Sequence, residues 1–492
     1  MKQRKYGNLI RIALFGTLTV LMLTGVLRVL NYKTTGGGGG WQHFYQIDND
    51  SIDIIFFGSS HAHCTIDHGY LWDNYGIAGY TLSAGSQQLD STCYFVKEAL
   101  RTHRPQVIAV EMMGTVMGEF NNTNVDAYRN SLGMKWSGNL VRYVDYLANS
   151  MNIDNSRKNE ILAKIPVVHS RYKELVKSDF EDDIPFMVGY RGSYEVMPLE
   201  QPEVEENEEV VKLSAEITRT LQEIIDEARK NGVEVVFFVA PFAVNDEEQM
   251  GFNAVEEYAK SQDVPFINYN KLYDEIGIDY STDFRDEDHV NNYGAIKVTG
   301  HLASFLRENY ELPDRRGDKN YKIWEDNSLY LRNKILRHEL ESAADLNEYL
   351  ELLAGSKDEK TIIVALTGNY KALGDVYLDK MIQLGITEEE YSEGGVFVWR
   401  NGKRQEWLSG KEYAKCFSTE SGEIHVESSI QLAGEGEEIQ NVKLLINGND
   451  YFLVENGVNM IVYEETLDQV IDAAGDDVYL GLELSHNDKQ GE

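Results

Sequence analysis

The sequence contains few cysteines: three in 492 residues, at Cys64, Cys93 and Cys416. None belongs to a CxxC pair, so the spacing typical of a structural zinc site is absent from the sequence. An odd number of widely spaced cysteines also provides no disulfide framework of the kind found in small secreted domains. We therefore expect no metal site and no cofactor. For a protein outside the cytoplasm, this cysteine usage favours a bacterial source.

Basic side chains are also scarce, since 46 Lys and Arg face 81 Asp and Glu and the net charge is −35. Recognition of nucleic acid through its phosphates requires clustered Lys and Arg, so a nucleic-acid partner is excluded. Apolar residues make up 42% of the chain, which is normal for a globular protein, and its length allows two to three domains. A basic excess lies at residues 1–33, which hold six Lys and Arg and no acid.

Long apolar runs are absent except near the N-terminus, where residues 12–27 read "IALFGTLTVLMLTGVL". This run is short for a full span, but flanking Arg and Lys side chains can extend it. A cleaved signal peptide is the alternative, although "RVLNYKTT" follows in place of small cleavage-site residues. We expect an uncleaved signal-anchor helix. More basic residues precede the run than follow it, which places the bulk of the chain outside a cell membrane crossed once.

The residues after the apolar run alternate between strand and helix patterns. The apolar runs "DIIFFG", "GIAGYTLSAG", "QVIAVEMM", "VEVVFFVAP" and "VPFINYN" read as strands, with amphipathic helical segments between them. This rhythm predicts a parallel sheet with helices on both faces, a three-layer α/β/α domain. It is interrupted at about 116–212, where we expect an insertion over the sheet that includes the Tyr- and Gly-rich stretch "FMVGYRGSYEVM".

From about residue 346 the sequence pattern changes to short predicted strands separated by turn signals such as Asn401-Gly402 and Asn447-Gly448. This predicts a separate β-rich α/β domain, with Cys416 in its core and Trp399 and Trp407 either packed, exposed or facing a sugar. The predicted organisation is a cytoplasmic tip and anchor helix at 1–33, a flexible Gly-rich linker at 34–50, the α/β/α domain at 51–312, a linker at 313–339, the β-rich domain at 340–480 and a polar tail at 481–492.

Candidate catalytic residues follow three of the predicted strands. Ser60 comes directly after "DIIFFG", Gly85 ends the second strand, and Asp286 and His289 share one later loop in a D-x-x-H spacing. Ligands of open α/β sheets bind at the carboxyl ends of the strands. A serine nucleophile needs a base, the base needs an orienting group, and the oxyanion needs N–H donors. We predict that Ser60 is the nucleophile, His289 the base and Asp286 the group that orients the base. The backbone N–H groups of Ser60 and Gly85 are the predicted oxyanion donors.

Each of these features also has a simpler interpretation. The Gly-Ser-Ser sequence can be a buried strand that ends in a polar turn, and Asp286 and His289 can belong to an exposed acidic turn. His61 and His63 lie in the loop of the candidate nucleophile. For these two histidines we expect packing and local hydrogen bonds within the turn, with contact to substrate as the alternative.

The motifs "FFGSSHA", "LSAGS" and "DEDHVNNYGA" resemble those of the SGNH/GDSL hydrolase superfamily over roughly residues 50–310. More closely, they resemble its membrane-anchored branch, which works beside membrane-bound O-acyltransferases in polysaccharide and cell-wall modification. The resemblance implies Ser60 as nucleophile, with Ser59 in the place of the family's aspartate, Gly85 as the second-block glycine, and Asp286 and His289 as the last block. The family's third block, G-x-N-D, has no counterpart after "VIAVEMMG"; Asn121 and Asn122 lie nearby without the motif.

The C-terminal part resembles an interleukin-like EMT inducer (PANDER-like) domain through "NVKLLINGNDYFLVENGVNMIVYEETLDQVIDA". Such domains are thought to be lectin-like or interaction modules. Together the resemblances imply a membrane-anchored esterase or O-acyltransferase that acts on acetyl-type esters of a cell-surface polysaccharide or other acylated glycan. A membrane-bound O-acyltransferase is the implied partner. The alternatives are a non-catalytic carbohydrate-binding scaffold and a structural envelope protein.

Overall fold

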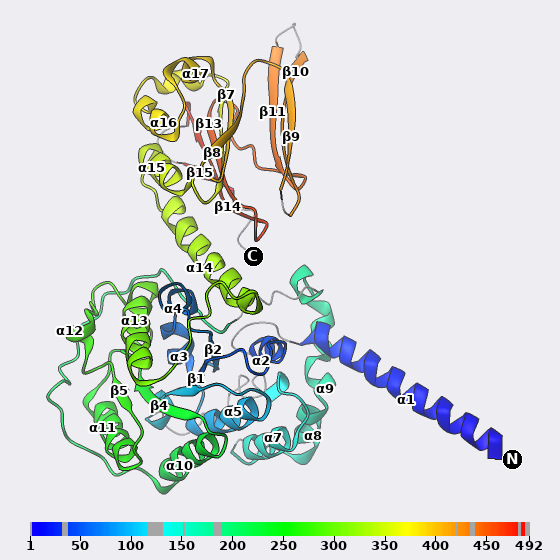
Figure 1. Cartoon of the computed structure of the whole chain (residues 1–492), viewed down its shortest axis with the longest axis vertical. Coiled ribbons are helices and arrows are strands. Elements are labelled where there is room, and N and C mark those ends of the chain that lie inside the picture. The colour runs from blue at the N-terminus through cyan, green and yellow to red at the C-terminus, as the bar shows by residue number, and fades with distance from the viewer. Residues whose placement is uncertain are drawn as a thin grey trace. The chain divides into compact units, whose positions relative to one another are not determined.

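The computed structural model describes residues 2–31, 38–116, 131–150, 153–180, 188–419, 421–432, 438–480 and 484–487. The chain divides into two compact units, Met1–Ser328 and Leu329–Glu492. The first contains a parallel sheet and the second contains two antiparallel sheets (Figure 1). This confirms the predicted fold class, an α/β/α domain followed by a β-rich α/β domain.

The sheet of the first unit has the order β2-β1-β3-β4-β5, and every neighbouring pair is parallel. Strand β1 is the apolar run that precedes Ser60. The strand order reverses at β1, because β2 lies on one side of it and β3 on the other. The carboxyl ends of all the strands therefore share one edge. The strands are β1 (Ile54–Gly58), β2 (Gly79–Ser83), β3 (Val107–Glu111), β4 (Glu234–Val239) and β5 (Phe266–Asn268).

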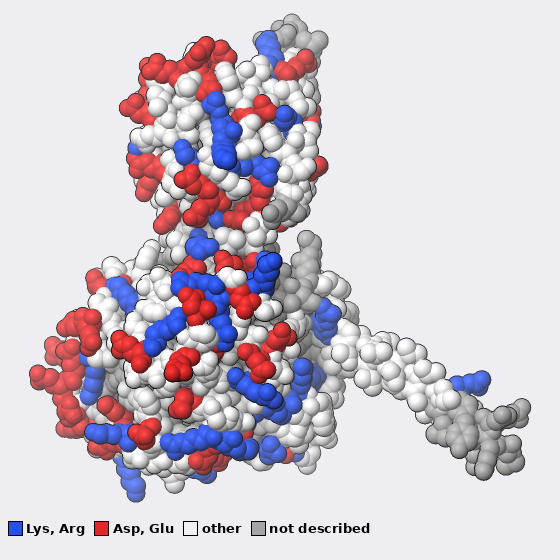
Figure 2. Space-filling view, viewed as in Figure 1, with Lys and Arg blue, Asp and Glu red and all other residues white. Residues whose placement is uncertain are grey.

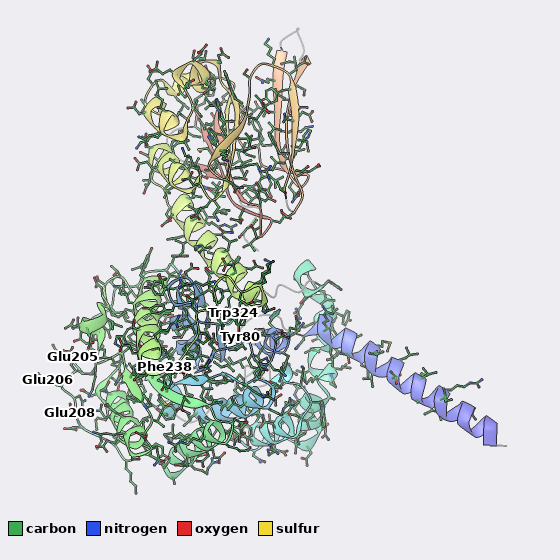
Figure 3. The ribbon with its side chains drawn as sticks, in the orientation of Figure 1. Tyr80, Glu205, Glu206, Glu208, Phe238 and Trp324 are labelled. Atoms are coloured by element: carbon green, nitrogen blue, oxygen red, sulfur yellow. The ribbon has the colours of Figure 1, made fainter. Side chains whose placement is uncertain are left out.

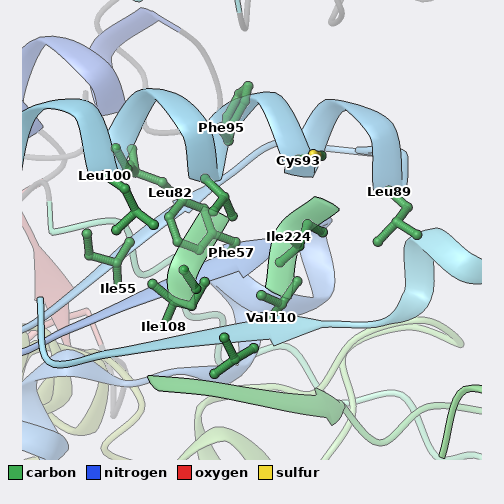
Figure 4. Close-up of a cluster of buried hydrophobic side chains, with 14 of the residues drawn as sticks. Ile55, Phe57, Leu82, Leu89, Cys93, Phe95, Leu100, Ile108, Val110 and Ile224 are labelled. Carbon is green, nitrogen blue, oxygen red and sulfur yellow. The ribbon is translucent and has the colours of Figure 1, made fainter. Parts of the chain in front are cut away.

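Alternate residues of each strand supply two separate hydrophobic cores, one on each face of the sheet. In β1, Ile55 and Phe57 join one core while Ile54 and Phe56 join the other. The first core is closed by α5 (Leu89–Thr102), α10 (Ala215–Lys230) and α11 (Asp246–Ser261). Figure 4 shows α5 over this core. The second is closed by α4 (His68–Tyr75) and α13 (Asn292–Asn309). Burial on both faces explains why the strands are apolar throughout and show no alternation in sequence.

The described part of the predicted insertion is helical up to Phe180, whereas residues 188–212 form neither helix nor strand. Helix α7 packs against α5 at the side of the sheet. The insertion contains α7 (Gly138–Ser150), α8 (Asn155–Ala163), α9 (Ile165–Val168) and the 3-10 turns η2 (His169–Lys173) and η3 (Lys177–Phe180). Two further short elements of the unit are η1 (Met113–Thr115) and α12 (Tyr273–Ile276).

Helix α1 (Lys2–Leu30) contains the segment Ile10–Leu30, 21 residues that are long and apolar enough to cross a membrane by length and composition. The prediction of a flexible spacer at 34–50 is wrong for its described part. Gly38–Phe44 form a helix, α2, and Trp41 and Phe44 are fully buried in the first core. Tyr80 donates a hydrogen bond to the Gly40 carbonyl at 2.7 Å. Residues 32–37 lie outside the described part of the chain.

Replacement of Trp41 by alanine is expected to lower the free energy of unfolding of the first unit by about 3–5 kcal/mol, the usual cost of removing a buried indole. Trp41 is 1% exposed and packs against Phe44 and Phe95. Urea unfolding of the full chain measures the change. Trp136, 69% exposed, provides the matched control, and its replacement by alanine is expected to cost less than about 0.5 kcal/mol. Equal costs would mean that α2 is not part of the core.

The second predicted linker, 313–339, is also largely structured. After a short 3-10 turn, η4 (Lys319–Tyr321), it enters the 20-residue helix α14 (Lys322–Glu341). Trp324 on this helix is buried, and its indole donates a hydrogen bond to the Gly79 carbonyl at 2.8 Å, beside Tyr80 (Figure 3). The polar composition indicated a linker, but Tyr321 and Trp324 are buried in the first core and hold the start of this helix there.

The second unit has a central six-stranded sheet with the order β15-β14-β13-β6-β7-β8, and a four-stranded sheet with the order β12-β11-β10-β9. One face of the larger sheet carries α15 (Leu346–Ser356), α16 (Leu378–Leu384), α17 (Glu388–Glu393) and the 3-10 turn η5 (Tyr370–Leu373); the smaller sheet covers the other. The strands are β6 (Thr361–Thr367), β7 (Gly395–Arg400), β8 (Lys403–Leu408), β9 (Tyr413–Ser418), β10 (Glu423–Leu432), β11 (Glu438–Ile446), β12 (Asn449–Asp450), β13 (Gly457–Glu464), β14 (Gln469–Asp477) and β15 (Ser485–His486).

The residues singled out in this unit have different environments. The expectation that Cys416 is in the core is wrong: it is exposed on β9 beside Glu423. Trp399 is buried, and Trp407 stacks on Phe397 with ring centroids 6.1 Å apart. Trp399 is therefore closed to a sugar, whereas Trp407 is half-buried and keeps part of its ring exposed.

Candidate active site

Strand β1 ends in a tight turn that places Ser60 at the carboxyl edge of the sheet. Gly58 has φ +151°, and a Cβ there would lie 2.7 Å from Cβ of Glu111, so the turn requires glycine. Ser59 follows as the N-cap of the short helix α3 (Ser60–Thr65), and its Oγ accepts a hydrogen bond from the His61 N–H at 3.3 Å. Ser60 is the first residue of this helix and is partly exposed.

Ser60, His289 and Asp286 form one chain of hydrogen bonds. Ser60 Oγ lies 2.7 Å from Nε2 of His289, and Nδ1 of the same ring lies 2.8 Å from Oδ1 of Asp286. The His289 side chain is 14% exposed and that of Asp286 44%. The structure therefore brings together two segments 229 residues apart, with the imidazole between a hydroxyl and a carboxylate. This is the geometry in which an imidazole takes a proton from a serine while a carboxylate holds its tautomer.

The loop that carries Asp286 and His289 is closed by its own hydrogen bonds. The Arg285 N–H donates to the His289 carbonyl at 3.1 Å, and the Asp288 N–H donates to Oδ1 of Asp286 at 3.0 Å. Nε of Arg285 donates to Oδ2 of Asp286 at 3.2 Å. Burial acts to raise the pKa of Asp286, but His289 and these donors outweigh it, so the pKa lies below its usual value. The carboxylate is thus held ionised and aimed at the ring.

Gly85 lies two residues beyond the end of β2, next to the turn Gly58–Ser60, which we call the nucleophile turn after the predicted role of Ser60. Gly58 and Ser83 are paired across β1 and β2, and the Ala84 N–H donates to the Gly58 carbonyl at 3.4 Å. A Cβ at Gly85 would meet no atom within 4 Å, so the space beside it is open. Within the described residues, the Gly85 N–H has no hydrogen-bond acceptor. Gly85 therefore has a donor and the room for a substrate oxygen.

His61 and His63, which follow Ser60 in α3, are buried and make packing and hydrogen-bond contacts near the turn. Nδ1 of His63 lies 2.8 Å from Oγ of Ser83, which ties the turn to β2. The His61 ring lies 5.1 Å from that of His289 and 5.2 Å from that of Phe242. Burial lowers the pKa of His61 to about 3 and that of His63 well below its usual value, so both rings are neutral near pH 7. His63 matches the expected local hydrogen bonding, and His61 matches the expected packing.

Glu111, at the end of β3, is a site residue that the sequence analysis missed. It is fully buried beneath the nucleophile turn, where Oε2 accepts from Ser59 Oγ at 3.1 Å and Oε1 accepts from the Met113 N–H at 2.8 Å. Burial raises its pKa to about 7. The signal in the sequence was one acidic residue at the end of an otherwise apolar strand. Glu111 positions the turn that presents Ser60.

The buried Glu111 carboxyl predicts a pH dependence of stability. Its pKa is about 7 in the folded protein against 4.5 for an ordinary glutamate, so the folded state keeps a proton that the unfolded chain releases between these values. The free energy of unfolding should therefore fall by about 3 kcal/mol as the pH rises from below 4.5 to above 7. In Glu111→Gln this component should vanish, because the amide is neutral throughout.

Urea unfolding at several pH values tests this prediction. Glu234→Gln is the matched control, since Glu234 is an exposed carboxylate at the start of the neighbouring strand β4. That variant is expected to keep the pH dependence of the wild-type chain. An unchanged pH dependence in Glu111→Gln would contradict the assignment.

A strap of the Tyr- and Gly-rich stretch, residues 188–197, connects the two sides of the site. Its Arg191 N–H donates to the carbonyl of His63, in the short helix that begins at Ser60, at 2.7 Å. Tyr190 donates to Oδ1 of Asn292 at 2.6 Å, and the Met197 N–H donates to the Phe284 carbonyl at 2.8 Å, beside the His289 loop. The part at 181–187 and the segment with Asn121 and Asn122 lie outside the described residues.

The arrangement defines a class of site: a serine hydroxyl, an imidazole and a carboxylate in line at the carboxyl edge of a parallel sheet. Among the described residues, no group of three or more His, Cys, Asp or Glu side chains is arranged to hold a metal ion. The chemistry available to these residues is nucleophilic attack by Ser60 on a carbonyl carbon.

Comparisons with known proteins give distant likenesses in structure. No family model matches the chain, and no curated protein matches it. A putative acylhydrolase from Bacteroides fragilis NCTC 9343 is similar at 11% identity over 53% of this chain and 87% of its own, with a TM-score of 0.25. A GDSL-like lipase from Bacteroides thetaiotaomicron VPI-5482 is similar at 10% identity over 53% of this chain and 89% of its own, also with a TM-score of 0.25.

Proposed function

We propose that this protein is an SGNH/GDSL-type serine esterase or O-acyltransferase that acts on acetyl-type esters of a cell-surface polysaccharide. The observation that carries the proposal is the hydrogen-bonded chain from Ser60 through His289 to Asp286. It joins, at one edge of the sheet, the residues that carry the resemblance to this superfamily. Roles for these residues follow from their chemistry.

In the proposed reaction His289 accepts the proton of Ser60 at Nε2 as Oγ attacks the ester carbonyl carbon. The resulting oxyanion receives hydrogen bonds from the Ser60 and Gly85 N–H groups. As the carbon–oxygen ester bond breaks, the departing alcohol oxygen takes the proton from His289, and the acyl group stays on Ser60. A water molecule or a sugar hydroxyl then attacks the acyl carbon and loses its proton to His289. The bond between the acyl carbon and Ser60 Oγ breaks, and Oγ takes that proton back from His289, which restores the free hydroxyl and the neutral imidazole. Asp286 stabilises the imidazolium in both halves.

The acyl-serine intermediate provides the direct test. The full chain is mixed with an aryl acetate, quenched in acid, digested and analysed by mass spectrometry for an acetyl group on the peptide that contains Ser60. We expect the adduct on the wild-type chain and its absence on Ser60→Ala. Absence of an adduct on the wild-type chain, together with no release of the aryl alcohol, would overturn the proposal.

The setting of the reaction is proposed from the sequence and from α1. An apolar helix at the N-terminus, with basic residues before it, supports a single-pass anchor with the rest of the chain outside the cell membrane. A membrane-bound O-acyltransferase is the proposed partner, and the PANDER-like second unit is the proposed glycan-binding module. Co-purification of the partner and sugar binding by the full chain test these two parts.

A non-catalytic scaffold is the second candidate function, and the missing G-x-N-D block favours it, because that block supplies one oxyanion donor in the resembled family. In a scaffold, Ser60 and His289 would be dispensable. Glycan acetylation that persists in a strain carrying His289→Asn, with no esterase activity in the purified chain, would favour this second function over the first.

A further inference from the structure

The end of α1 is docked on the first unit. Leu30 is buried with Leu132 and Val168, and Leu27, Val167 and Leu175 pack around them. Arg171 donates hydrogen bonds from Nη1 to the carbonyls of Leu30, at 3.0 Å, and Asn31, at 2.7 Å. These bonds satisfy carbonyls that a helix leaves without an intrahelical partner at its C-terminus. The docked helix end therefore fixes which face of the unit adjoins the membrane when α1 spans it.

The length of α1 places this docked end at the membrane boundary. The 21 residues Ile10–Leu30 extend about 31 Å as a helix, which matches a hydrocarbon core about 30 Å thick. Leu30 then lies where the hydrocarbon ends, and the residues that contact it lie in the headgroup region. The headgroup region is about 5–8 Å deep on each side. Side chains that lie within this distance of Leu30 along the membrane normal are therefore also in the headgroup region.

The face around the docked end consists of residues 131–136 and 164–180, and we call it the membrane-side face. It exposes large apolar side chains: Trp136 is 69% exposed, Tyr172 62%, Val176 59% and Phe180 65%. Exposed aromatic rings beside a membrane-spanning helix are typical of the interfacial belt, where one end of each ring is wet and the other apolar.

The charge of this face differs from that of the rest of the protein. Residues 131–136 and 164–180 contain five Lys and Arg and two acids, Glu174 and Asp179, in a chain whose net charge is −35. Lys135 and Lys173 are exposed, and each lies over a tyrosine ring, that of Tyr45 and Tyr172 respectively. Acidic residues gather instead at the opposite side of the view, where Glu205, Glu206 and Glu208 lie (Figures 2 and 3). A basic face is complementary to anionic lipid phosphates.

A cavity of about 500 Å³ opens beside the same helix end. Its lining includes Leu27, Leu132 and Met134 as apolar residues and Arg28, Gln42 and Lys135 as polar ones. A mixed lining of this kind, at the depth where hydrocarbon meets headgroups, suits the glycerol and phosphate region of a phospholipid. The cavity and the exposed rings therefore point to the same occupant.

We propose that the membrane-side face rests on the outer leaflet of the membrane, with Trp136, Tyr172 and Phe180 at headgroup depth and Lys135 and Lys173 against anionic phosphates. This inference rests on the proposed anchoring by α1. It goes beyond anchoring, because it assigns a second, interfacial contact to the first unit.

Trp136 provides an intrinsic probe of this contact. Of the six tryptophans, Trp41, Trp72, Trp324 and Trp399 are buried and Trp407 is half-buried, so Trp136 is the exposed one. The full chain is reconstituted in vesicles of phosphatidylcholine and phosphatidylglycerol, with and without brominated phosphatidylcholine. We expect bromolipid to quench the fluorescence of the wild-type chain, and Trp136→Phe to lose most of that quenching.

Two further measurements complete the test. Lys135→Glu with Lys173→Glu is expected to reduce the bromolipid quenching, while the control pair Lys212→Glu with Lys260→Glu, at exposed sites elsewhere in the unit, is expected to leave it unchanged. A chain that floats with the vesicles but shows equal quenching in wild type and Trp136→Phe overturns the inference and leaves α1 as the anchor. A chain that does not float overturns the anchor, and the inference with it; neither outcome bears on the esterase chemistry.

Discussion

Replacement of Ser60 by alanine is expected to lower kcat/KM for an aryl acetate by about 10⁴-fold or more, because the variant lacks the atom that forms the acyl intermediate. Ser60 Oγ is the one hydroxyl within 2.7 Å of His289 Nε2 among the described residues. The free energy of unfolding should change little, since Ser60 is partly exposed and its side chain does not cap the helix. Initial-rate measurements with the purified full chain give the ratio.

Ser59→Ala is the matched control for this prediction. Ser59 is adjacent, but its hydroxyl faces the buried Glu111 and caps α3. Loss of an N-cap side chain costs about 1 kcal/mol of stability, and the rate should fall far less than in Ser60→Ala. Equal losses in both variants, or a rate in Ser60→Ala close to that of the wild-type chain, would exclude Ser60 as the nucleophile.

Replacement of His289 by asparagine is expected to reduce the rate of acylation by about 10⁴-fold, because an amide cannot take up the proton that Ser60 loses. Residues of a triad act as a unit, so the double variant with Ser60→Ala should lose no more than either single variant. Single-turnover release of the aryl alcohol measures the acylation step. His425→Asn in the second unit is the control and should keep the wild-type rate.

An additive loss in the double variant would show that Ser60 and His289 act independently. The comparison also addresses His61, which packs on His289 and has a buried Nδ1 with no hydrogen-bond partner among the described residues. If His61 were the base, His289→Asn would retain most of the activity. The pKa of His61, about 3, opposes that role.

The sequence was informative about the fold because the first unit is a parallel sheet. Each strand is buried on both faces, so it appears as a continuous apolar run, and each run ends at the shared carboxyl edge. Ser60 and His289 could therefore be placed at one edge from residues 229 positions apart, and the structure has them 2.7 Å apart. The catalytic roles of these residues stay predictions.

Local composition was misleading where tertiary contacts decide the conformation. Residues 38–44 and 322–339 looked like linkers because they are rich in glycine or polar residues, yet they lie in α2 and α14. Trp41 and Trp324 each bury a large ring against the sheet, and that burial outweighs a weak helix propensity. Glu111 was missed for a related reason, since its partner Ser59 lies 52 residues away and only the fold brings the two together.

The docked end of α1 has a consequence for which substrates the site can reach. A free glycine-rich tether of 17 residues would let Ser60 explore a volume with a radius of about 20–25 Å above the bilayer. If α1 spans the membrane as proposed, Arg171 holds the carbonyls of Leu30 and Asn31, and that volume would shrink to a narrow layer. Esters at the height of this layer would be selected, whereas chemically identical esters further along the same polymer would escape. Substrate specificity would then depend on the distance of the ester from the membrane surface as well as on the chemistry of the ester.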